Sequence, residues 1–497
     1  MTIASISEEA ITADPATTEP TIAAPDIPVT WRSMWQDGHL GRFAILCLGV
    51  WLHATDCLLV ATLIPSTVAD IGGAQFINWT IALYQLASIT TGAAAGLMVA
   101  RIGYRPAMIG AALLYALGCC LSAVAPNMLL MLIGRLLQGC GGGSLVALAF
   151  VAMEHLFPTR IAVRLLAIIS TVWGVAAFTG PLVGGFFAAL GEWRLGFWAF
   201  AAQAVLLAVI ILVRQKHVVI ALHHKPRMPV LRLAIFALAV LAIASAGIDV
   251  TWLRAGLFCL VGAGLFAVFL WLDHRGLDRG GGNNRLFPRQ IAMPRHPLGA
   301  GYAMIFVSAT ATIAFTVYSP VLLTSLAGAN PLLCGYMIAI ESISWTVATL
   351  IISSLHQVNQ RWLIRCGSAG LTIAVIGLAI TMPLQDGSWT SLALLLPFII
   401  LEGAGFGMCY PFIQRRIVAA ADEPERGRAS AGVPTVQMIG YAIGAAASGI
   451  IANAAGFAEG VSRNAALHVG FWIFAAFLPL CLIGNLCAWR LTRGDKT

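Results

Sequence analysis

Leu132-Ile133-Gly134-Arg135-Leu136-Leu137-Gln138-Gly139 places one arginine inside a long apolar run. Further along the chain, Gly180-Pro181-Leu182-Val183-Gly184-Gly185 lies within another apolar run. A guanidinium group in membrane hydrocarbon is expensive unless it faces a protein interior or a water-filled cavity. Small residues at the centre of a membrane helix allow close packing against neighbouring helices. The two runs therefore indicate membrane helices that perform a function rather than anchor the chain.

The composition of the 497-residue chain is that of a membrane protein. Hydrophobic residues make up 59% and charged residues 10%, whereas soluble proteins carry about 25% charged residues. A membrane-spanning helix needs about 20 mostly apolar residues, so we expect an all-α membrane protein. The sequence predicts fourteen spans, at 43–65, 78–99, 107–125, 128–152, 162–188, 195–213, 232–248, 252–272, 299–325, 332–354, 363–382, 389–413, 432–455 and 467–490.

The basic residues predict the orientation in the membrane. Of the 29 Lys and Arg residues, Arg135 lies within a span, and only Arg194, Arg254 and Arg463 fall in the segments that would face outward. Because cytoplasmic loops carry an excess of Lys and Arg, we expect a multi-pass protein of the cell (inner) membrane with both termini cytoplasmic. The net charge of +8 is spread over short loops rather than one face, so no nucleic-acid partner is expected.

The predicted spans divide into groups of six, two and six. Residues 1–39 are rich in Thr, Ala, Pro and acids, and we expect a disordered cytoplasmic tail there, without a cleavable signal peptide. Residues 40–213 would form an N-terminal six-helix bundle. Residues 214–298 would form a two-helix insert with basic linkers, and residues 299–492 a C-terminal six-helix bundle.

Only a few ionisable residues lie deep in the spans. Asp56 lies near the middle of the first span, Glu341 and Glu402 lie in the tenth and twelfth, and Arg135 lies in the fourth. A carboxyl group in a low-dielectric environment can bind its proton near working pH, which is what a proton-coupled carrier requires. The alternative for each acid is a structural role, in which it is hydrogen-bonded to a neighbouring helix and never titrates.

Other residues in the spans have two possible interpretations. His53 lies one turn before Asp56 on the same helix face, but a single membrane histidine is more often a packing residue. In the segment 403–407, glycine occupies alternate positions after Glu402, which predicts either a flexible backbone or a close helix crossing. Four deep aromatic residues would line a substrate cavity or pack against lipid and core: Tyr84, Phe178, Trp345 and Tyr410.

The eleven cysteines show no paired metal-ligand spacing and lie in or beside apolar spans. We interpret them as buried small apolar residues and expect neither a disulfide framework nor a metal site.

As a set, these motifs resemble the major facilitator superfamily, and specifically its 14-helix drug:proton antiporter branch. The fourth span is similar to the family's motif B, through Arg135, Gln138 and Gly139. The fifth span resembles motif C, the antiporter signature, through Gly174, Gly180, Pro181, Gly184 and Gly185.

Two further segments carry the resemblance. Asp56, followed nine residues later by Pro65, is similar to the first helix of that branch. The loop between the second and third spans matches motif A through Gly96, Arg101, Gly103 and Arg105. The acidic position of motif A is Ala100 in this chain. In the family, that acid belongs to a cytoplasmic charge latch between the two halves, so its absence bears on gating.

The resemblance covers about residues 40–492 and implies a major facilitator fold, with two six-helix bundles and two extra central helices, fourteen spans in all. It implies a monomeric, proton-coupled secondary active exporter (antiporter) of amphipathic or lipophilic small molecules such as drugs. Transport would proceed by alternating access, driven by the proton gradient without a cofactor. Proton coupling or substrate binding would fall to Asp56, Arg135, Glu341 and Glu402, and the helix 5 and loop motifs would control the movement of the bundles.

Two alternative functions follow from the same sequence. A major facilitator importer or facilitator of a metabolite or siderophore would share the fold, although the intact motif C argues against uptake. A polytopic membrane enzyme would need clustered acids or histidines near the membrane surface. The nearest candidate is Asp273 to Asp278 with His274, which lacks a metal-ligand spacing.

Overall fold

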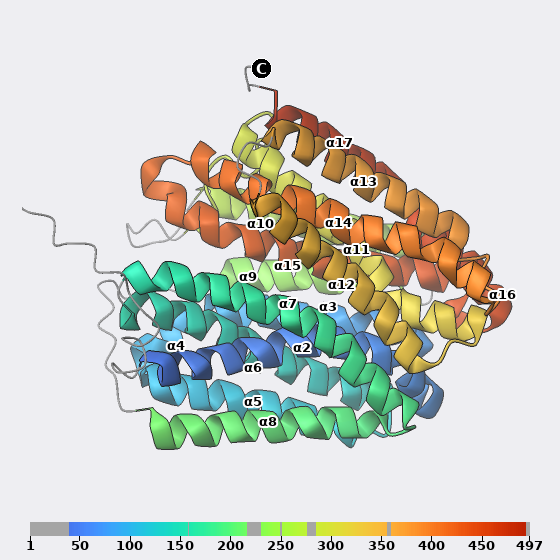
Figure 1. Cartoon of the computed structure of the whole chain (residues 1–497), viewed down its shortest axis with the longest axis horizontal. Coiled ribbons are helices and arrows are strands. Elements are labelled where there is room, and N and C mark those ends of the chain that lie inside the picture. Colours follow the sequence, from blue (N-terminus) through green and yellow to red (C-terminus); the bar gives the residue numbers. More distant parts are fainter. Residues whose placement is uncertain are drawn as a thin grey trace, which may run out of the picture.

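The computed structural model describes residues 39–157, 159–215, 230–248, 251–275, 285–354 and 359–493. The expected tail at 1–39 falls outside these ranges except for its last residue, and so do large parts of both basic linkers. The described chain is helical, and no strand occurs within it (Figure 1). An all-α membrane fold is therefore confirmed.

The N-terminal bundle occupies the lower half of Figure 1. Its elements are α2 (His39–Ile71), η1 (Ala74–Phe76), α3 (Ile77–Ala93), α4 (Ala95–Ile102), α5 (Tyr104–Ala123), α6 (Met128–Leu156), α7 (Thr159–Ala189) and α8 (Trp193–Arg214). Asn127 is the N-cap of α6, and its Oδ1 accepts a hydrogen bond of 3.0 Å from Leu130 N, which would otherwise lack a partner within the helix.

The insert and the C-terminal bundle follow. The insert contains α9 (Val230–Ser245) and α10 (Trp252–Arg275). The C-terminal bundle contains α11 (Pro297–Ala327), α12 (Pro331–Ser354), α13 (Gln360–Thr381), α14 (Trp389–Ala420), η2 (Glu423–Glu425), α15 (Arg426–Ala454), η3 (Phe457–Glu459), α16 (Arg463–Ala475) and α17 (Leu478–Leu491).

The described residues provide twelve helices that are long and apolar enough to cross a membrane, with α16 and α17 forming one of them. The bent pair α3 and α4, whose axes differ by 50°, would make a thirteenth. The remaining apolar helix, α9, has 16 residues, fewer than the about 20 that a span needs. Twelve to thirteen candidate spans are therefore shown, and the expected number of fourteen stays a prediction.

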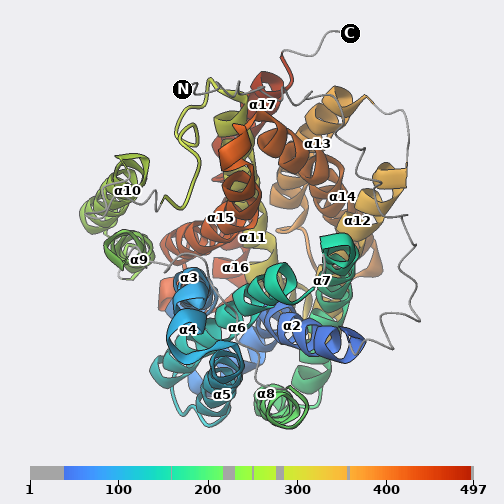
Figure 2. The same cartoon turned by 90° about the vertical axis from the view of Figure 1, so that its left-hand side faces the viewer.

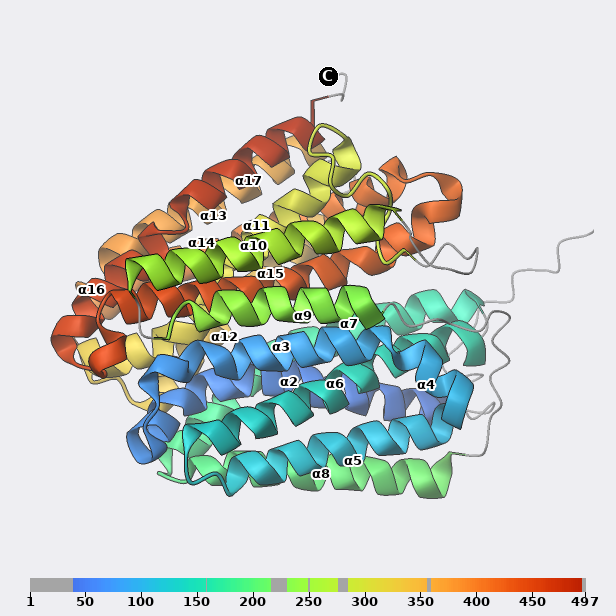
Figure 3. The ribbon, with the colours of Figure 1, turned by 180° about the vertical axis from the view of Figure 1, so that it is seen from behind.

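The two bundles meet along two seams. Figure 2, which looks along the helices, shows α3 next to α15 on one side and α7 next to α12 on the other. The two helices of each pair are in contact. The α9 helix lies against α3 and α15, and α10 packs on the outside of α9 (Figure 3). The ribbons of the two bundles diverge toward the α4 end (Figures 1 and 3).

At the end opposite α4, one side chain joins both bundles and the insert. The amide nitrogen of Asn453 in α15 donates to the carbonyl oxygen of Gln75 at 3.0 Å and to that of Gly247 at 2.8 Å. Because Gln75 belongs to the N-terminal bundle and Gly247 follows α9, the hydrogen bonds of Asn453 hold three parts of the chain together at this end.

The insert is also fixed at its other end. Asp273 at the end of α10 forms a buried ion pair with Arg232 of α9, with an N–O distance of 3.0 Å. The same carboxylate accepts hydrogen bonds from the backbone N–H groups of Leu286 and Phe287, at 2.9 and 3.1 Å. Asp273, the nearest candidate for an enzymatic cluster, is thus a structural acid. No cluster of three potential metal ligands occurs among the described residues.

Candidate functional site

Asp56 on α2 and Arg135 on α6 form an ion pair inside the N-terminal bundle. Arg135 Nη1 lies 2.7 Å from Asp56 Oδ2, and both side chains are 0% exposed. The sequence places both residues in spans, but it contains no signal that they meet, because they are 79 residues apart. Removing one partner of such a pair costs about 3–5 kcal/mol, since the other charge is left buried and uncompensated.

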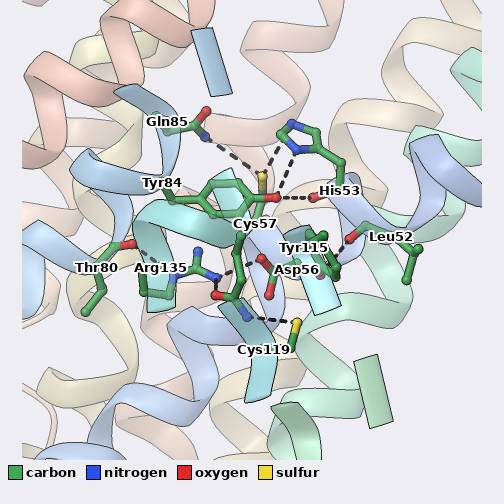
Figure 4. A network of polar contacts seen from close by, with 11 residues as sticks. Leu52, His53, Asp56, Cys57, Thr80, Tyr84, Gln85, Tyr115, Cys119 and Arg135 are labelled. Atoms are coloured by element: carbon green, nitrogen blue, oxygen red, sulfur yellow. Dashed lines mark hydrogen bonds and ion pairs between the residues drawn. The ribbon is translucent and has the colours of Figure 1, made fainter. Parts of the chain in front are cut away.

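Three further groups hold the guanidinium of Arg135 (Figure 4). Its Nε donates to the carbonyl oxygen of Thr80 at 3.1 Å, and its Nη1 donates to Gln138 Oε1 at 2.8 Å. The ring of Tyr84 lies 4.2 Å from the guanidinium carbon, which adds a cation–π attraction. Arg135 Nη2 and Asp56 Oδ1 make no hydrogen bond with the described residues, so the pair keeps one free donor and one free acceptor.

His53 is not an isolated packing residue. Its ring is fully buried, and its Nδ1 lies 2.9 Å from the hydroxyl oxygen of Tyr84. Of the four deep aromatic residues, Tyr84 therefore belongs to the polar network around the ion pair rather than to an apolar lining. Phe178 is 40% exposed on the surface of α7, which places it outside the bundle core.

Glu402 on α14 is the buried acid of the C-terminal bundle. Its side chain is 1% exposed, and neither carboxyl oxygen has a hydrogen-bond partner among the described residues. Isolated ionised carboxylates are strongly disfavoured away from water. Unlike Asp56, Glu402 is therefore held at low cost only as the neutral acid.

Glu341 on α12 is half-buried and lies beside Thr316 of α11. Its carbonyl oxygen packs against Gly403, the residue that follows Glu402. The structure thus brings together Asp56 with Arg135 in one bundle and Glu341 with Glu402 in the other. The four predicted charged residues form two sites, one in each bundle.

The alternate glycines at 403–407 produce two close helix crossings. A methyl group at position 407 would lie 3.0 Å from Thr349 Oγ1 of α12, whereas one at Gly405 would lie 2.8 Å from the carbonyl oxygen of Gly367 of α13. The α14 helix runs without interruption through the segment. The glycines therefore let α14 contact α12 and α13 at once and place Glu402 between them.

An aromatic cluster lies on the same helices as the two acids. Trp345 of α12 and Phe406 of α14 have ring centroids 4.6 Å apart, and the rings of Phe406 and Tyr410 are stacked at 5.5 Å. The hydroxyl of Tyr410 donates to Gln437 Oε1 of α15 at 2.9 Å, and Gln437 Nε2 donates to Tyr441 at 2.8 Å. Sequence reasoning missed Gln437 and Tyr441. A polar residue in the middle of an apolar span was the available signal.

The glycine- and proline-rich motif of the fifth predicted span lies on α7 and packs on two sides. Gly180 and Gly184 face α2, because methyl groups there would lie 2.8 Å from the carbonyl oxygen of Thr55 and 2.5 Å from that of Leu59. The remaining motif residues face α12 of the other bundle. Methyl groups at Gly174 and Gly185 would contact Thr346 and the Pro331 carbonyl, and one at Gly335 would lie 2.5 Å from the carbonyl oxygen of Pro181.

The loop motif forms the turn between α4 and α5. Gly103 has φ +85°, a conformation that residues with a side chain rarely adopt. Arg101 is exposed, as is Ala100, and Arg105 Nη2 donates to the carbonyl oxygen of Leu212 near the end of α8. Gly96 lies in the first turn of α4. In this conformation Arg105 thus binds the end of a helix in its own bundle.

Two cavities of the described structure have walls that contain none of Asp56, Arg135, Glu341 and Glu402. One of about 500 Å³ lies between the bundles at the end opposite α4, lined by Pro65 and Val68 of α2, Val321 and Thr324 of α11, and Glu459. The other has about 10 Å³ and lies within the C-terminal bundle, with Ser308, Thr312, Ser368 and Cys481 in its wall. The smaller cavity is about the size of one water molecule. All eleven cysteines are free thiols.

Comparison with known proteins identifies relatives along most of the chain. Residues 46–229 and 357–497 match the family described as the Major Facilitator Superfamily. A probable multidrug-efflux transporter of Mycobacterium tuberculosis is 29% identical over 490 residues, which cover 94% of this chain and 97% of that protein. An uncharacterized transporter of the same organism is 25% identical over 415 residues, covering 82% of this chain and 59% of that protein.

Solved structures share the fold at low sequence identity. A D-xylose-proton symporter aligns with a TM-score of 0.64 and 16% identity, covering 92% of this chain and all of that one. A bacterial homolog of the human lysosomal transporter Spinster, in an inward-facing and occupied conformation, aligns with a TM-score of 0.65 and 12% identity, covering 92% of this chain and 97% of that one. At these identities the likeness shows the fold alone.

Proposed function

This chain belongs to the major facilitator superfamily, and from that premise we propose that it is a proton-coupled exporter of amphipathic or lipophilic small molecules. Membership makes it a secondary transporter and not an enzyme. The observation that carries the proposal is the buried carboxyl group of Glu402, which has no hydrogen-bond partner among the described residues. The name of the 29% identical relative supports the direction of transport.

The physical argument starts from the state of Glu402. A carboxyl group that is out of water and has no partner has a much lower free energy as the neutral acid than as the anion. If the site becomes wet on one side of the membrane and dry on the other, Glu402 releases its proton on the wet side only. The neighbouring Glu341 charge strengthens this preference, because two carboxylates that share a dry site cannot both ionise at low cost.

The Asp56–Arg135 pair has the complementary role in this proposal. Its charge is already compensated, so at rest it neither needs a proton nor releases one. Asp56 accepts a proton only when Arg135 is displaced from it, as when a cationic substrate or a bundle movement changes the site. Arg135 thereby tunes the proton affinity of Asp56 during the cycle.

The substrate class follows from the groups beside the acids. The Trp345, Phe406 and Tyr410 rings lie on the helices that carry Glu341 and Glu402. Aromatic faces attract cations, and binding sites for small molecules combine apolar walls with a few polar groups. An amphipathic molecule with a cationic group fits this combination.

The glycine- and proline-rich motif of α7 supports alternating access. In α7, Gly174, Pro181 and Gly185 lie against α12, so the two bundles contact each other through backbone and small side chains. Such a contact can open as a unit, because few interdigitated side chains must be withdrawn. We propose that α7 and α12 form the seal that separates substrate from the side opposite α4 in this conformation.

Fourteen spans and cytoplasmic termini complete the proposal. The hairpin α9–α10 would supply the seventh and eighth spans, with the 16 residues of α9 crossing a locally thinned bilayer. Labelling of single cysteines in the α8–α9 and α9–α10 connections with an impermeant thiol reagent tests this, in a cysteine-free background. Labelling of the two connections from opposite sides supports fourteen spans, and labelling of both from one side contradicts them.

Everted membrane vesicles test the direction of transport and its coupling. With an acidic lumen, the wild type should accumulate ethidium, a fluorescent amphipathic cation, and an uncoupler should abolish the accumulation. Glu402→Gln should abolish it as well, whereas Glu423→Gln, which changes an exposed acid of η2, should not. Gradient-driven movement of substrate toward the cytoplasmic side would instead indicate the importer.

A further inference from the structure

His53 and Tyr84 connect the buried ion pair to the bundle interface, although neither takes part in the proposed exchange of protons. His53 lies one turn before Asp56 on α2, and it is 0% exposed. A buried imidazole needs partners for its ring nitrogens. Figure 4 shows the partners of His53, which are Tyr84 and Cys57, and the position of Tyr84 beside Arg135.

Tyr84 of α3 contacts Arg135 through its ring and His53 through its hydroxyl group. Its ring covers the guanidinium of Arg135 at 4.2 Å. Its hydroxyl oxygen lies 2.9 Å from His53 Nδ1 and 3.2 Å from the His53 carbonyl oxygen. When the hydroxyl donates to the carbonyl, Nδ1–H can donate to the hydroxyl oxygen, so the tyrosine is held by two hydrogen bonds. The imidazole therefore fixes the ring that lies against Arg135.

Glycine at position 142 in α6 makes room for this arrangement. A methyl group there would lie 2.8 Å from His53 Nδ1 and 3.0 Å from the Tyr84 hydroxyl oxygen. The first distance is too short for a carbon atom and the second is tight, so an alanine must displace His53 Nδ1 and shift the Tyr84 hydroxyl by a few tenths of an ångström. By contrast, a methyl group at Gly110 of α5 would meet no atom within 4 Å. The two glycines offer a matched pair of substitutions.

The path continues from His53 to α7. The His53 ring meets the Trp173 ring edge-on, with centroids 5.7 Å apart. Trp173 directly precedes Gly174, where a methyl group would lie 3.5 Å from Thr346 of α12 in the other bundle. Contacts thus run from Arg135 through Tyr84 and His53 to Trp173, which is adjacent in the chain to a glycine at the seam between α7 and α12.

The titratable and charged groups around Asp56 and His53 come from several helices. Cys57 lies on the same helix, with its Sγ 3.9 Å from His53 Nε2. The α7 neighbour, Trp173, does not titrate. Titratable groups of four other helices lie near this site, namely Tyr84 of α3, Tyr115 and Cys119 of α5, Arg135 of α6 and, near Cys57, Tyr441 of α15.

We propose that His53 and Tyr84 are positioning residues that set how firmly Arg135 holds Asp56 and that report the position of α7 to this ion pair. A shift of α7 displaces Trp173, the contact of Trp173 with His53 changes, and Tyr84 relaxes its hold on the guanidinium. Asp56 then accepts a proton more readily. The inference rests on the proposed proton-coupled function for its purpose, but the geometry it invokes can be tested without transport.

Infrared difference spectroscopy of the purified full-length protein tests the positioning role directly. The carboxyl C=O band that disappears in Asp56→Asn reports protonation of Asp56 as a function of pH. Tyr84→Phe removes the hydroxyl but keeps the ring, and His53→Asn keeps an atom near Nδ1 but removes the ring contact with Trp173. Each should raise the midpoint of the Asp56 titration by about half a pH unit or more, because a loosened counter-ion stabilises the carboxylate less.

The glycine pair and a double variant make the test specific. Gly142→Ala should raise the midpoint as the side-chain variants do, whereas Gly110→Ala should leave it unchanged. The shift in Tyr84→Phe/Trp173→Ala should be smaller than the sum of the single shifts, since Trp173 acts on Arg135 only through His53 and the hydroxyl of Tyr84. Midpoints equal to the wild type in Tyr84→Phe and His53→Asn would overturn the proposal, and so would additive shifts.

Transport measurements separate this inference from the proposed function. If the wild type shows no proton-driven ethidium movement but the Asp56 titration shifts as expected, the proposed function fails and the positioning role stands. If proton-driven transport is present and the titration of every variant matches the wild type, the positioning role fails and the proposed function stands.

Discussion

The two bundles bury a carboxyl group to a similar depth but surround it differently. In the N-terminal bundle, Asp56 is 2.7 Å from Arg135, which has further partners in Thr80 and Gln138. In the C-terminal bundle, both carboxyl oxygens of Glu402 lack a partner among the described residues. The N-terminal bundle can therefore hold a carboxylate, and we propose that the C-terminal bundle holds a neutral acid. Proton exchange is therefore expected first at Glu402.

The largest expected effect breaks the compensated site. Arg135→Ala leaves Asp56 buried without a counter-ion, so we expect a loss of about 3–5 kcal/mol in the free energy of unfolding and no gradient-driven efflux. Thermal unfolding of purified protein and the amount inserted in membranes measure the first effect. Arg135→Ala/Asp56→Asn should recover part of the lost stability, because no uncompensated charge remains. A double variant as unstable as the sum of both single variants would contradict the pairing.

Close helix crossings should give the next largest effects, and they differ by seam. In Gly184→Ala, the added methyl group meets the Leu59 carbonyl oxygen inside the N-terminal bundle at 2.5 Å. Overpacking of this kind typically costs about 1–3 kcal/mol, which thermal unfolding would detect. Gly335→Ala meets the Pro181 carbonyl oxygen across the seam at the same distance. We expect it to reduce transport while changing stability less, and equal losses of stability would contradict this contrast.

Part of this arrangement could be predicted from the sequence, and part could not. The long apolar runs predict the helices, because every span must satisfy its backbone hydrogen bonds internally. The cost of buried charge singles out Asp56, Arg135 and Glu402 as candidate functional residues. The pairing of Asp56 with Arg135 could not be predicted from the sequence, since it depends on how α2 and α6 pack rather than on spacing along the chain.

The glycine patterns illustrate the same limit. Alternate glycines at 403–407 were compatible with a flexible segment, but the structure has an unbroken helix with two crossings. Which neighbour each glycine faces is a property of the bundle. The sequence favours a packing role for His53 over a participating one, because nothing in it indicates Tyr84, 31 residues away on another helix, as a partner.

Glu402→Gln should have a small effect on stability, unlike Arg135→Ala. No ion pair is lost, and a neutral amide replaces a group that we propose to be neutral already, so the free energy of unfolding should change by less than about 1 kcal/mol. Thermal unfolding at neutral pH measures this. A destabilisation as large as that of Arg135→Ala would show that Glu402 is a structural anion.

The smallest effect is expected at an acid outside the spans. Asp386 accepts hydrogen bonds from the backbone N–H and the hydroxyl of Ser388, at 2.9 and 2.6 Å, and these lower the pKa of Asp386 to about 2. A lowered pKa stabilises the folded state above the unfolded pKa of about 4, and this contribution is lost as the pH falls toward 2. Asp386→Asn should therefore melt slightly below the wild type at pH 7, and the difference should vanish near pH 2. A difference that grows on acidification would contradict this sign.

We propose that Glu402 carries a proton at rest while Arg135 keeps Asp56 ionised. Infrared spectroscopy of the purified protein at pH 7 tests it most directly, through the C=O band of protonated carboxyl groups. We expect Glu402→Gln to remove part of this band and Asp56→Asn to leave it unchanged. A band that survives in Glu402→Gln and decreases in Asp56→Asn would show that the proton is on Asp56 instead of Glu402.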